Sequence, residues 1–305
     1  MLPVSIVICS YAEERWDHLT AAVRSIAAQT LEPAQVIVSV DHNEALLERV
    51  RAELPGVTCV ENSESRGLSG ARNSGVAAAS GEVIAFLDDD ACAAPDWLEW
   101  LVRPYADERV MGVGGAIEPA WEAGVRPAGF PAEFQWVVGC SYAGLPTAPA
   151  PVRNLIGANM SIRRSVFEAV GGFSTGIGRV GKLPVGCEET ELCIRARQRI
   201  PGAEFVFEPR ARVSHAVPTS RATWAYFRSR CFAEGISKAQ VAALAGSRDG
   251  LSSERAYVMK ALPSGFARGI RDAMRGDASG AVRSAGIVSG LVLTTAGYVA
   301  GRARA

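Results

Sequence analysis

The sequence predicts an α/β domain with a mostly parallel central sheet flanked by helices, followed by a helical C-terminal extension. Short apolar runs alternate with amphipathic stretches through the first half of the chain, which is the pattern of a parallel sheet. The chain has 305 residues, enough for one large α/β domain and an appendage. Helix-forming residues dominate from residue 221 onward. We therefore expect one domain over residues 1–220 and an extension over residues 221–305.

Each expected element has a local signal. Strands are short apolar runs, whereas helices carry apolar residues at helical spacing and end near Pro33, Pro55 and Gly81. Pro and Gly accumulate over residues 119–151, where we expect loops. The expected strands are residues 4–9, 36–40, 57–60, 83–87, 155–163 and 204–207, with Val213 in a further strand-like run. The expected helices are residues 17–29, 45–54, 69–79, 96–105, 164–170 and 188–198.

The composition excludes several classes of protein. With 48% hydrophobic residues and a formal net charge of +0, the chain is globular and lacks the basic excess that nucleic-acid binding needs. The seven cysteines are scattered and form no CxxC pair, which favours a reducing cytoplasm. Met1 leads directly into an apolar strand, without the pattern of a signal peptide. We expect a cytoplasmic protein, at the inner face of the plasma membrane if it meets a membrane.

Three consecutive aspartates follow the expected strand at residues 83–87. Asp88 and Asp90 point to one side of the strand and Asp89 to the other, because successive side chains alternate. Two carboxylates on one side repel each other unless a cation lies between them, and Mg²⁺ or Mn²⁺ takes such oxygen ligands together with phosphate oxygens. The alternative is that these aspartates cap the helix beginning near Asp96 and face water.

Two further acidic sites lie on the chain. Asp41 ends the second strand at the same expected sheet edge, where it either accepts hydrogen bonds from a nucleotide or belongs to an ordinary turn. Glu188, Glu189 and Glu191 open a helix after a glycine-rich loop. Their charges favour a helix start in any case, but one of them facing an acceptor hydroxyl would be a general base.

Several motifs in order give the chain a resemblance to the family 2 inverting glycosyltransferases, which have the glycosyltransferase-A fold. No single motif is specific, but their order and spacing cover residues 4–215. The resemblance implies a nucleotide-binding half over residues 1–115 and an acceptor-binding half over residues 116–220. The motifs are residues 4–11 (VSIVICSY), 25–30 (SIAAQT), 36–41 (VIVSVD), 66–75 (RGLSGARNSG), 81–90 (GEVIAFLDDD), 171–173 (GGF) and 188–193 (EETELC).

The resemblance also implies roles for single residues. Asp41 contacts the base, Arg72 reaches the diphosphate and Asn73 braces the adjacent loop. Asp88 faces the ribose or donor sugar, and Asp90 holds the metal. Two alternatives stay open, an exposed surface arginine for Arg72 and a purely structural Asn159. The implied nucleotide-binding and donor-binding residues are Ser10, Tyr11, Glu13, Asp41, Arg66, Arg72, Asp88, Asp89 and Asn159.

The chain departs from the family at the catalytic base, where the usual Glu-Asp pair is Glu188-Glu189. A glutamate still accepts a proton, so both residues stay candidates, and we favour Glu189. His215 resembles a histidine that completes the metal site in some relatives, although a lone histidine is more often structural. The glycine-rich loop at residues 176–186 is expected to border the sugar and to close over the bound donor.

The implied reaction is inverting transfer of a sugar from a nucleotide-diphosphate sugar to an acceptor hydroxyl. The donor carries UDP, GDP or dTDP, the cofactor is Mg²⁺ or Mn²⁺, and the acceptor is a saccharide, a lipid-linked molecule or a small molecule. Cell-envelope polysaccharide, glycolipid or secondary-metabolite glycan synthesis would need such an enzyme. Two alternatives are a sugar-phosphate nucleotidylyltransferase and a nucleotide-sugar-binding relative without catalytic activity.

The C-terminal extension carries two membrane signals. Residues 221–245 combine aromatic and basic side chains, which is typical of a helix at a membrane surface but also of a packed amphipathic helix. Residues 285–301 contain no charged side chain but fall short of the ~20 residues that a membrane span needs. We expect a helix that is membrane-associated or docked on the core rather than one that spans the bilayer.

Overall fold

The computed structural model describes residues 2–177, 186–246 and 257–303. The chain forms two compact units. The sheet unit comprises Met1–Ile117, Pro146–Lys182 and Glu188–Ser214, whereas the helical unit comprises Glu118–Leu145, Leu183–Cys187 and His215–Ala305. The division that the sequence predicts, after residue 220, stays a prediction.

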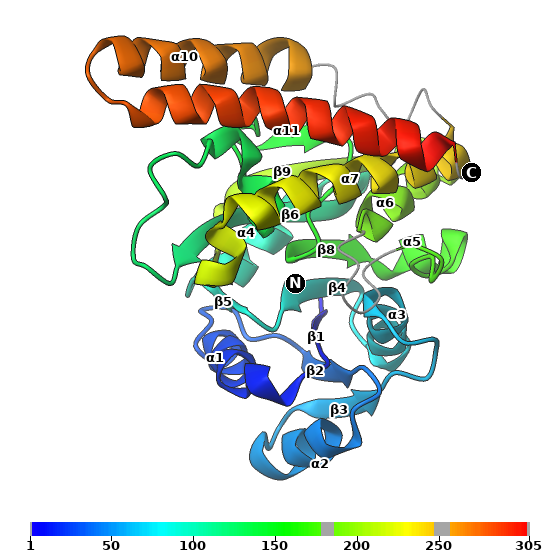
Figure 1. Ribbon diagram of the computed structural model, residues 1–305. Coiled ribbons are helices and arrows are strands. Elements are labelled where there is room, and N and C mark those ends of the chain that lie inside the picture. Colours follow the sequence, from blue (N-terminus) through cyan, green and yellow to red (C-terminus); the bar gives the residue numbers. More distant parts are fainter. Residues whose placement is uncertain (1, 178–185, 247–256, 304–305) are drawn as a thin grey trace. The chain divides into compact units, whose positions relative to one another are not determined.

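The N-terminal half of the sheet unit is a parallel sheet with helices on both faces. Strand β1 lies between β2 and β4, and β3 pairs outside β2, all in parallel. Figure 1 shows α1 and α3 on opposite sides of β1 and β2. The strands are β1 (Val4–Ser10), β2 (Gln35–Val40), β3 (Thr58–Glu61) and β4 (Val83–Asp88). The helices are η1 (Glu13–Arg15), α1 (Trp16–Ala27), α2 (Glu44–Glu53) and α3 (Leu68–Ala78).

The rest of the sheet joins with antiparallel strands. β8 pairs antiparallel with β4 and with β6, and β7 pairs antiparallel with β9, so the strand order is β3-β2-β1-β4-β8-β6-β9-β5. The expected mostly parallel sheet with flanking helices is therefore confirmed, with antiparallel pairs added to it. The further elements are β5 (Ala91–Ala93), α4 (Trp97–Val102), η2 (Arg103–Ala106), β6 (Val110–Trp121), β7 (Ala150–Val152), β8 (Asn159–Arg163), α5 (Arg164–Val170), α6 (Glu188–Arg199) and β9 (Glu204–Val217).

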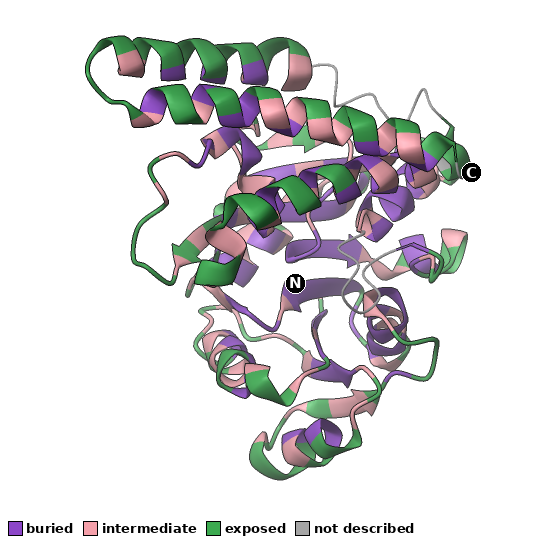
Figure 2. Ribbon diagram, viewed as in Figure 1, coloured by how far each residue is buried: buried purple, intermediate pink, exposed green. Residues whose placement is uncertain are grey.

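The central strands are buried on both faces because their sequences are almost wholly apolar. In β4, every residue from Val83 to Leu87 is buried (Figure 2). Phe86 packs edge-on against Phe173, with ring centroids 5.4 Å apart, and lies 6.3 Å from Phe167. This cluster fixes the position of β4, and through it the aspartates that follow.

The expectation of loops over residues 119–151 is wrong at three places. β6 continues to Trp121, η3 covers Ala132–Val138, and β7 begins at Ala150. The glycines of β6 resemble loop residues in the sequence but are required by packing. A Cβ on Gly115 would lie 1.9 Å from the carbonyl oxygen of Ala211, so only glycine lets β6 run there.

The helical unit is built on three helices in close contact. α7 (Trp224–Ala245) and α10 (Leu262–Met274) each pack against α11 (Ser279–Arg302), and α10 and α11 form a hairpin (Figure 1). A Cβ on Gly297 of α11 would lie 2.0 Å from the carbonyl oxygen of Phe232 in α7. Glycine therefore lets the two helix backbones approach closely. The unit also contains η3, η4 (Thr219–Ala222) and η5 (Tyr257–Ala261).

Candidate active site

The acidic residues predicted for one sheet edge do share that edge. In the sheet register, Cys9 of β1 pairs with Asp88 of β4, and Ser10 pairs with Val40, the residue before Asp41. The carboxyl ends of parallel strands in open α/β sheets are where ligands bind. The sheet therefore presents Ser10, Asp41 and Asp88 together at a ligand-binding edge.

The three consecutive aspartates lie in different environments. The Asp88 side chain is 32% exposed, whereas Asp89 is 2% and Asp90 7% exposed. The Ser10 hydroxyl donates a hydrogen bond of 2.7 Å to Asp89, so this carboxylate is turned inward. Burial, together with the nearby Asp90, raises the pKa of Asp89 to about 7 although Arg15 lowers it. Asp88 is thus the partly exposed carboxylate of the run, whereas Asp89 and Asp90 are both buried.

Arg15 is a site residue that the sequence did not single out. It is the last residue of η1 and the N-cap of α1. It binds two aspartates of the run, with 2.8 Å between Nη1 and an oxygen of Asp89 and an ion pair to Asp90. Burial lowers the pKa of Arg15, but these carboxylates outweigh it and raise the pKa. The guanidinium also lies over the ring of Tyr11. No local motif marks Arg15, because its partners are more than seventy residues away.

Arg72 is buried rather than exposed, so the alternative of a surface arginine is wrong. Only 2% of the residue is accessible, and it donates hydrogen bonds to Glu188 (2.6 Å) and to the carbonyl oxygen of Gly157 (3.1 Å). Its Nη2 atom lies 3.6 Å from Asp88. Burial lowers the pKa of Arg72, but Glu188 and Asp88 outweigh it and raise the pKa. A permanent cation is therefore fixed beside the exposed carboxylate at the sheet edge.

The glutamates that open α6 have different partners. Glu188 is 4% exposed and is bound by Arg72, whereas Glu191 is bound by Arg195 at 2.7 Å and accepts a hydrogen bond from Ser174. Glu189, between them, is half-buried. Consecutive helix residues point about 100° apart, so Glu189 faces another direction than Glu188. Glu188 is thus held by Arg72, and the choice of Glu189 as the general base stays a prediction.

Asp41 organises the loop that precedes α3. One of its oxygens accepts a hydrogen bond of 2.6 Å from the Asn62 amide, and the other accepts one of 3.0 Å from the backbone of Gly67. Arg66, in the same loop, is exposed and donates to the carbonyl oxygen of His42. The base-contacting role of Asp41 and the donor-binding role of Arg66 stay predictions.

Asn73 binds the loop after α5, and its bracing role at the donor-binding residues stays a prediction. Its amide donates to the carbonyl oxygen of Phe173 (2.9 Å) and accepts from the backbone N–H of the same residue (2.7 Å). Ser69, one turn earlier in α3, donates 2.8 Å to the carbonyl oxygen of Ile177. These contacts hold the residues just before the glycine-rich loop. Most of that loop, residues 178–185, lies outside the described part of the chain.

The remaining predicted residues are placed as follows. Tyr11 is 56% exposed, and Glu13 is exposed at the start of η1. Asn159 is fully buried, where it accepts from the Trp97 indole (2.7 Å) and donates to the carbonyl oxygens of Ala116 and Ala211 (both 2.9 Å). These contacts join β8 to its neighbours, as the structural alternative expects, and a donor contact by Asn159 stays a prediction.

His215 lies near the end of β9 and is 3% exposed. Its Nδ1 atom is 3.8 Å from the sulfur of Cys140. Asp88, Asp90 and His215 are candidate ligands for a metal ion among the residues that the structure describes. Two carboxylates and an imidazole are donors that Mg²⁺ and Mn²⁺ accept, so these residues fit such an ion chemically.

A parallel sheet that presents carboxylates and a buried arginine at its carboxyl edge has the arrangement of a ligand-binding site in an open α/β fold. The model of the family described as "Glycosyl transferase family 2" matches residues 5–171. The chain belongs to this family.

Two curated proteins are similar along most of the chain. The glucosyl-dolichyl phosphate glucuronosyltransferase of Haloferax volcanii is 38% identical over 241 residues, which cover 78% of this chain and 76% of that protein. The succinoglycan biosynthesis protein ExoM of Rhizobium meliloti is 29% identical, and the match covers 95% of this chain and 93% of that one.

Two solved structures share the fold. The mannosyltransferase PcManGT from Pyrobaculum calidifontis, in complex with GDP-Man and Mn²⁺, has a TM-score of 0.59 at 18% identity and covers 96% of this chain and 87% of that one. GalNAc-T7 with UDP, GalNAc and Mn²⁺ has a TM-score of 0.53 at 21% identity and covers 77% of this chain and 48% of that one, so this chain spans about half its length. The protein is thus a glycosyltransferase of the glycosyltransferase-A fold, and its activity is glycosyl transfer in glycan synthesis.

Proposed function

We propose that this glycosyltransferase moves a sugar from a nucleotide-diphosphate donor to a hydroxyl of a lipid-linked saccharide at the inner face of the plasma membrane. The observation that carries the donor assignment is the buried Arg72 fixed 3.6 Å from the partly exposed Asp88 at the sheet edge. A rigid cation at this edge suits a diphosphate, since the guanidinium fork matches phosphate oxygens. The lipid-linked acceptor is supported by the name of the Haloferax volcanii relative.

We assign the metal to Asp90 and His215, with Asp88 on the donor side. His215 is included because its strand, β9, is hydrogen-bonded to the segment after the aspartate run. The carbonyl oxygen of Arg212 in β9 accepts a hydrogen bond of 3.0 Å from the backbone N–H of Ala94. His215 is three residues beyond Arg212. When bound, Mn²⁺ or Mg²⁺ would offset negative charge that develops on the departing diphosphate.

Glu189 is the proposed general base. It would accept the proton of the acceptor hydroxyl while that oxygen attacks the anomeric carbon from the face opposite the leaving group. Arg72 stabilises the leaving diphosphate, and Glu188 holds Arg72 in place. Inversion follows from a single displacement.

The donor assignment is tested by thermal shift with UDP-, GDP- and dTDP-sugars, with and without Mn²⁺. A donor that binds only the folded state raises the melting temperature, and we expect one nucleotide to do so in a metal-dependent manner. The shift should disappear in Asp90→Asn. If no donor shifts the protein with Mn²⁺, or Asp90→Asn keeps the full shift, the proposed donor site is wrong.

The base assignment is tested by a pair of variants. Glu189→Gln should lower kcat by about 10²–10⁴ while donor binding is retained. Glu188→Gln is the matched change on the neighbouring residue and should weaken donor binding, because it releases Arg72. A larger loss of kcat in Glu188→Gln, with donor binding intact, would transfer the role of base to Glu188.

A further inference from the structure

The α10–α11 hairpin exposes an apolar surface that no described residue covers. On α10, Phe266, Ile270 and Met274 recur every four residues and are 40%, 38% and 77% exposed. This spacing places them in one stripe along the helix. A soluble protein seldom leaves large apolar side chains exposed in a row unless the surface binds something.

A second apolar surface of the hairpin lies on the outward face of α11. The exposed residues of α11 from Val282 to Val299 recur at helical spacing, and none of them is charged, whereas Arg302 at the end of the helix is exposed and basic. Val288, Val292 and Val299 are 49%, 60% and 62% exposed. The opposite face of α11 is occupied, because Gly290 packs on Phe134 and Gly297 on Phe232. One face of α11 therefore packs on the protein, whereas the opposite face is apolar and is covered by no residue within the described ranges.

Basic side chains accompany the apolar stripe of α10. Arg268, Arg271 and Arg275 recur at intervals of three and four residues, and all three are exposed. Residues 257–305 contain seven Lys and Arg and two Asp and Glu, a net charge of +5, whereas the whole chain has a net charge of +0. The rest of the chain is therefore net acidic, and the positive charge concentrates on the segment that also carries the apolar surface.

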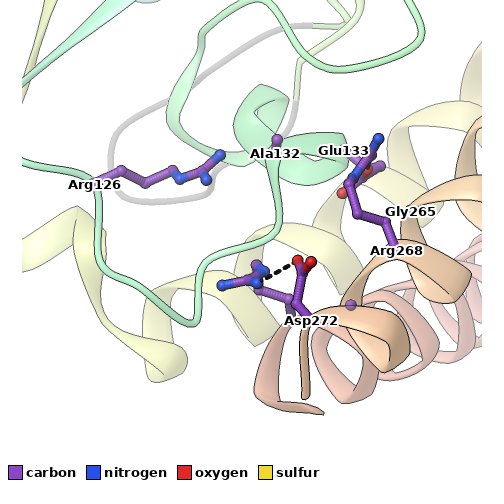
Figure 3. Close-up of a pocket in the computed structure, with 8 residues that line it drawn as sticks. Arg126, Ala132, Glu133, Gly265, Arg268 and Asp272 are labelled. Atoms are coloured by element: carbon purple, nitrogen blue, oxygen red, sulfur yellow. Dashed lines mark hydrogen bonds and ion pairs between the residues drawn. The ribbon is translucent and has the colours of Figure 1, made fainter. Parts of the chain in front are cut away.

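A pocket with three arginines lies at this hairpin (Figure 3). Arg268 pairs with the buried Glu133, and Arg283 pairs with Asp272 at 2.8 Å. Arg126 is exposed and makes no hydrogen bond or ion pair with any residue that the structure describes. Two of the three cations are thus neutralised locally, and Arg126 leaves an unmatched positive charge. The lining residues are Arg126, Ala132, Glu133, Gly265, Arg268, Gly269, Asp272 and Arg283.

The pocket has the size and charge for a phosphate group. Its volume is about 210 Å³. One water molecule takes about 30 Å³ of liquid, so a phosphate fits with room for its ester substituents. Arginine is also the side chain that best matches phosphate oxygens, since its donors form a planar fork.

We propose that the α10–α11 hairpin docks on a bilayer containing anionic phospholipids, with the phosphate of a lipid headgroup in the pocket beside Arg126. Apolar side chains next to basic ones suit the boundary between acyl chains and headgroups. The proposal rests on the membrane location given under the proposed function and names the surface and the lipid class responsible. Because α11 packs along α7, which carries Arg228, Arg230 and Lys238, the hairpin lies on the surface rather than across the bilayer.

Flotation of the full chain with vesicles tests the proposal. Vesicles of phosphatidylcholine that also contain phosphatidylglycerol should bind the protein at least about tenfold more tightly than phosphatidylcholine vesicles, because each basic residue near an anionic surface contributes about fivefold. Arg126→Glu should weaken this binding by about twenty-fivefold. The double variant Phe266→Ser/Ile270→Ser should weaken binding to vesicles of both compositions by about tenfold or more.

Arg24→Glu is the matched control, since Arg24 is an exposed arginine of α1 in the sheet unit. It makes the same change of charge and should alter vesicle binding by less than about twofold. The donor-induced thermal shift of every variant should match that of the unchanged protein, which shows that each is folded. It also separates failure of membrane docking from failure of the proposed donor site.

Four results would overturn the proposal. Equal affinity for both vesicle compositions would show that the protein does not recognise an anionic headgroup. Stabilisation by inorganic phosphate without vesicle binding would show that the pocket binds free phosphate instead of a lipid. A stable dimer that Phe266→Ser/Ile270→Ser converts to a monomer would assign the surface to self-association. Retention of the protein in cell membranes after carbonate extraction would show an integral helix.

Discussion

The sheet unit and the helical unit differ in what they bury. The sheet unit buries ion pairs, whereas the helical unit buries glycines where two helices touch. The sheet unit encloses full charges, such as Arg72 with Glu188 and Arg15 with Asp89. The helical unit gains its close helix contacts by omitting side chains, as at Gly297. A buried ion pair adds little net stability to the fold but fixes its charged groups in place. Close helix packing stabilises the fold because it leaves few voids between the side chains. The buried charges of the sheet unit hold the residues of the candidate active site in position. The glycines of the helical unit hold α11 close to α7.

The largest expected effect comes from breaking the buried ion pair of the sheet unit. Arg72→Met leaves Glu188 buried without its cation and should lower the free energy of unfolding by about 3–5 kcal/mol. The double variant Arg72→Met/Glu188→Leu removes both charges and should regain most of that loss without regaining activity. Urea unfolding measures both. A double variant as unstable as the single one would show that the pair itself stabilises the fold.

The next effect comes from adding a side chain to the helical unit. Gly297→Leu forces α11 away from Phe232 of α7 and should cost about 3 kcal/mol of unfolding free energy, measured by thermal unfolding. Ala296→Leu adds the same side chain at the neighbouring, exposed position and should cost less than about 0.5 kcal/mol. Equal losses in the two variants would contradict the role assigned to glycine.

A neutral polar residue of the sheet unit should have an intermediate effect. Asn159→Ala leaves the Trp97 indole and two backbone carbonyls without their hydrogen bonds and should cost about 2 kcal/mol. Chemical denaturation measures the loss, and donor affinity should fall little. Reduced donor affinity with unchanged stability would instead support Asn159 as a donor contact.

The smallest expected effect is a pH dependence in the helical unit. Burial raises the pKa of Glu234, but Lys238 and Arg230 outweigh it and hold the pKa below its ordinary value of 4.5. Because the folded pKa is the lower one, Glu234 stabilises the fold above about pH 4.5, and this contribution is lost as the pH falls through the folded pKa. Glu234→Gln should cost about 1 kcal/mol at neutral pH and flatten this acid dependence, measured by unfolding across the pH range. If the variant loses the same stability between neutral and acid pH as the unchanged protein, groups other than Glu234 cause the pH dependence.

The sequence predicts the parallel half of the fold well because its signals are local. β4 is apolar from Val83 to Leu87, β1 is apolar apart from Ser5 and Ser10, and helix α5 begins and ends at the predicted residues. The sequence does not predict β6 and predicts only part of β9. Both strands contain glycines or charged residues, whose place in a strand depends on contacts with the neighbouring strands. Gly115 is the clearest example, since its requirement comes from the carbonyl of Ala211, far along the chain.

The candidate site divides in the same way. Asp41 and Asp88 could be placed from sequence because Asp41 directly follows β2 and Asp88 ends β4, and the strand ends of a parallel sheet meet at one edge. Arg15 could not, because its partners come from another part of the sheet. Nor could sequence separate Glu188 from Glu189, since the difference lies in which of them Arg72 binds.

Arg15 also bears on how the protein behaves when divalent metal is scarce. Its guanidinium forms ion pairs with both Asp89 and Asp90, and so reduces the repulsion between these two carboxylates near the candidate metal site. The fold therefore carries an internal counter-ion and does not depend on the metal to hold these charges together. We therefore expect these aspartates to keep their positions in a metal-free buffer as well.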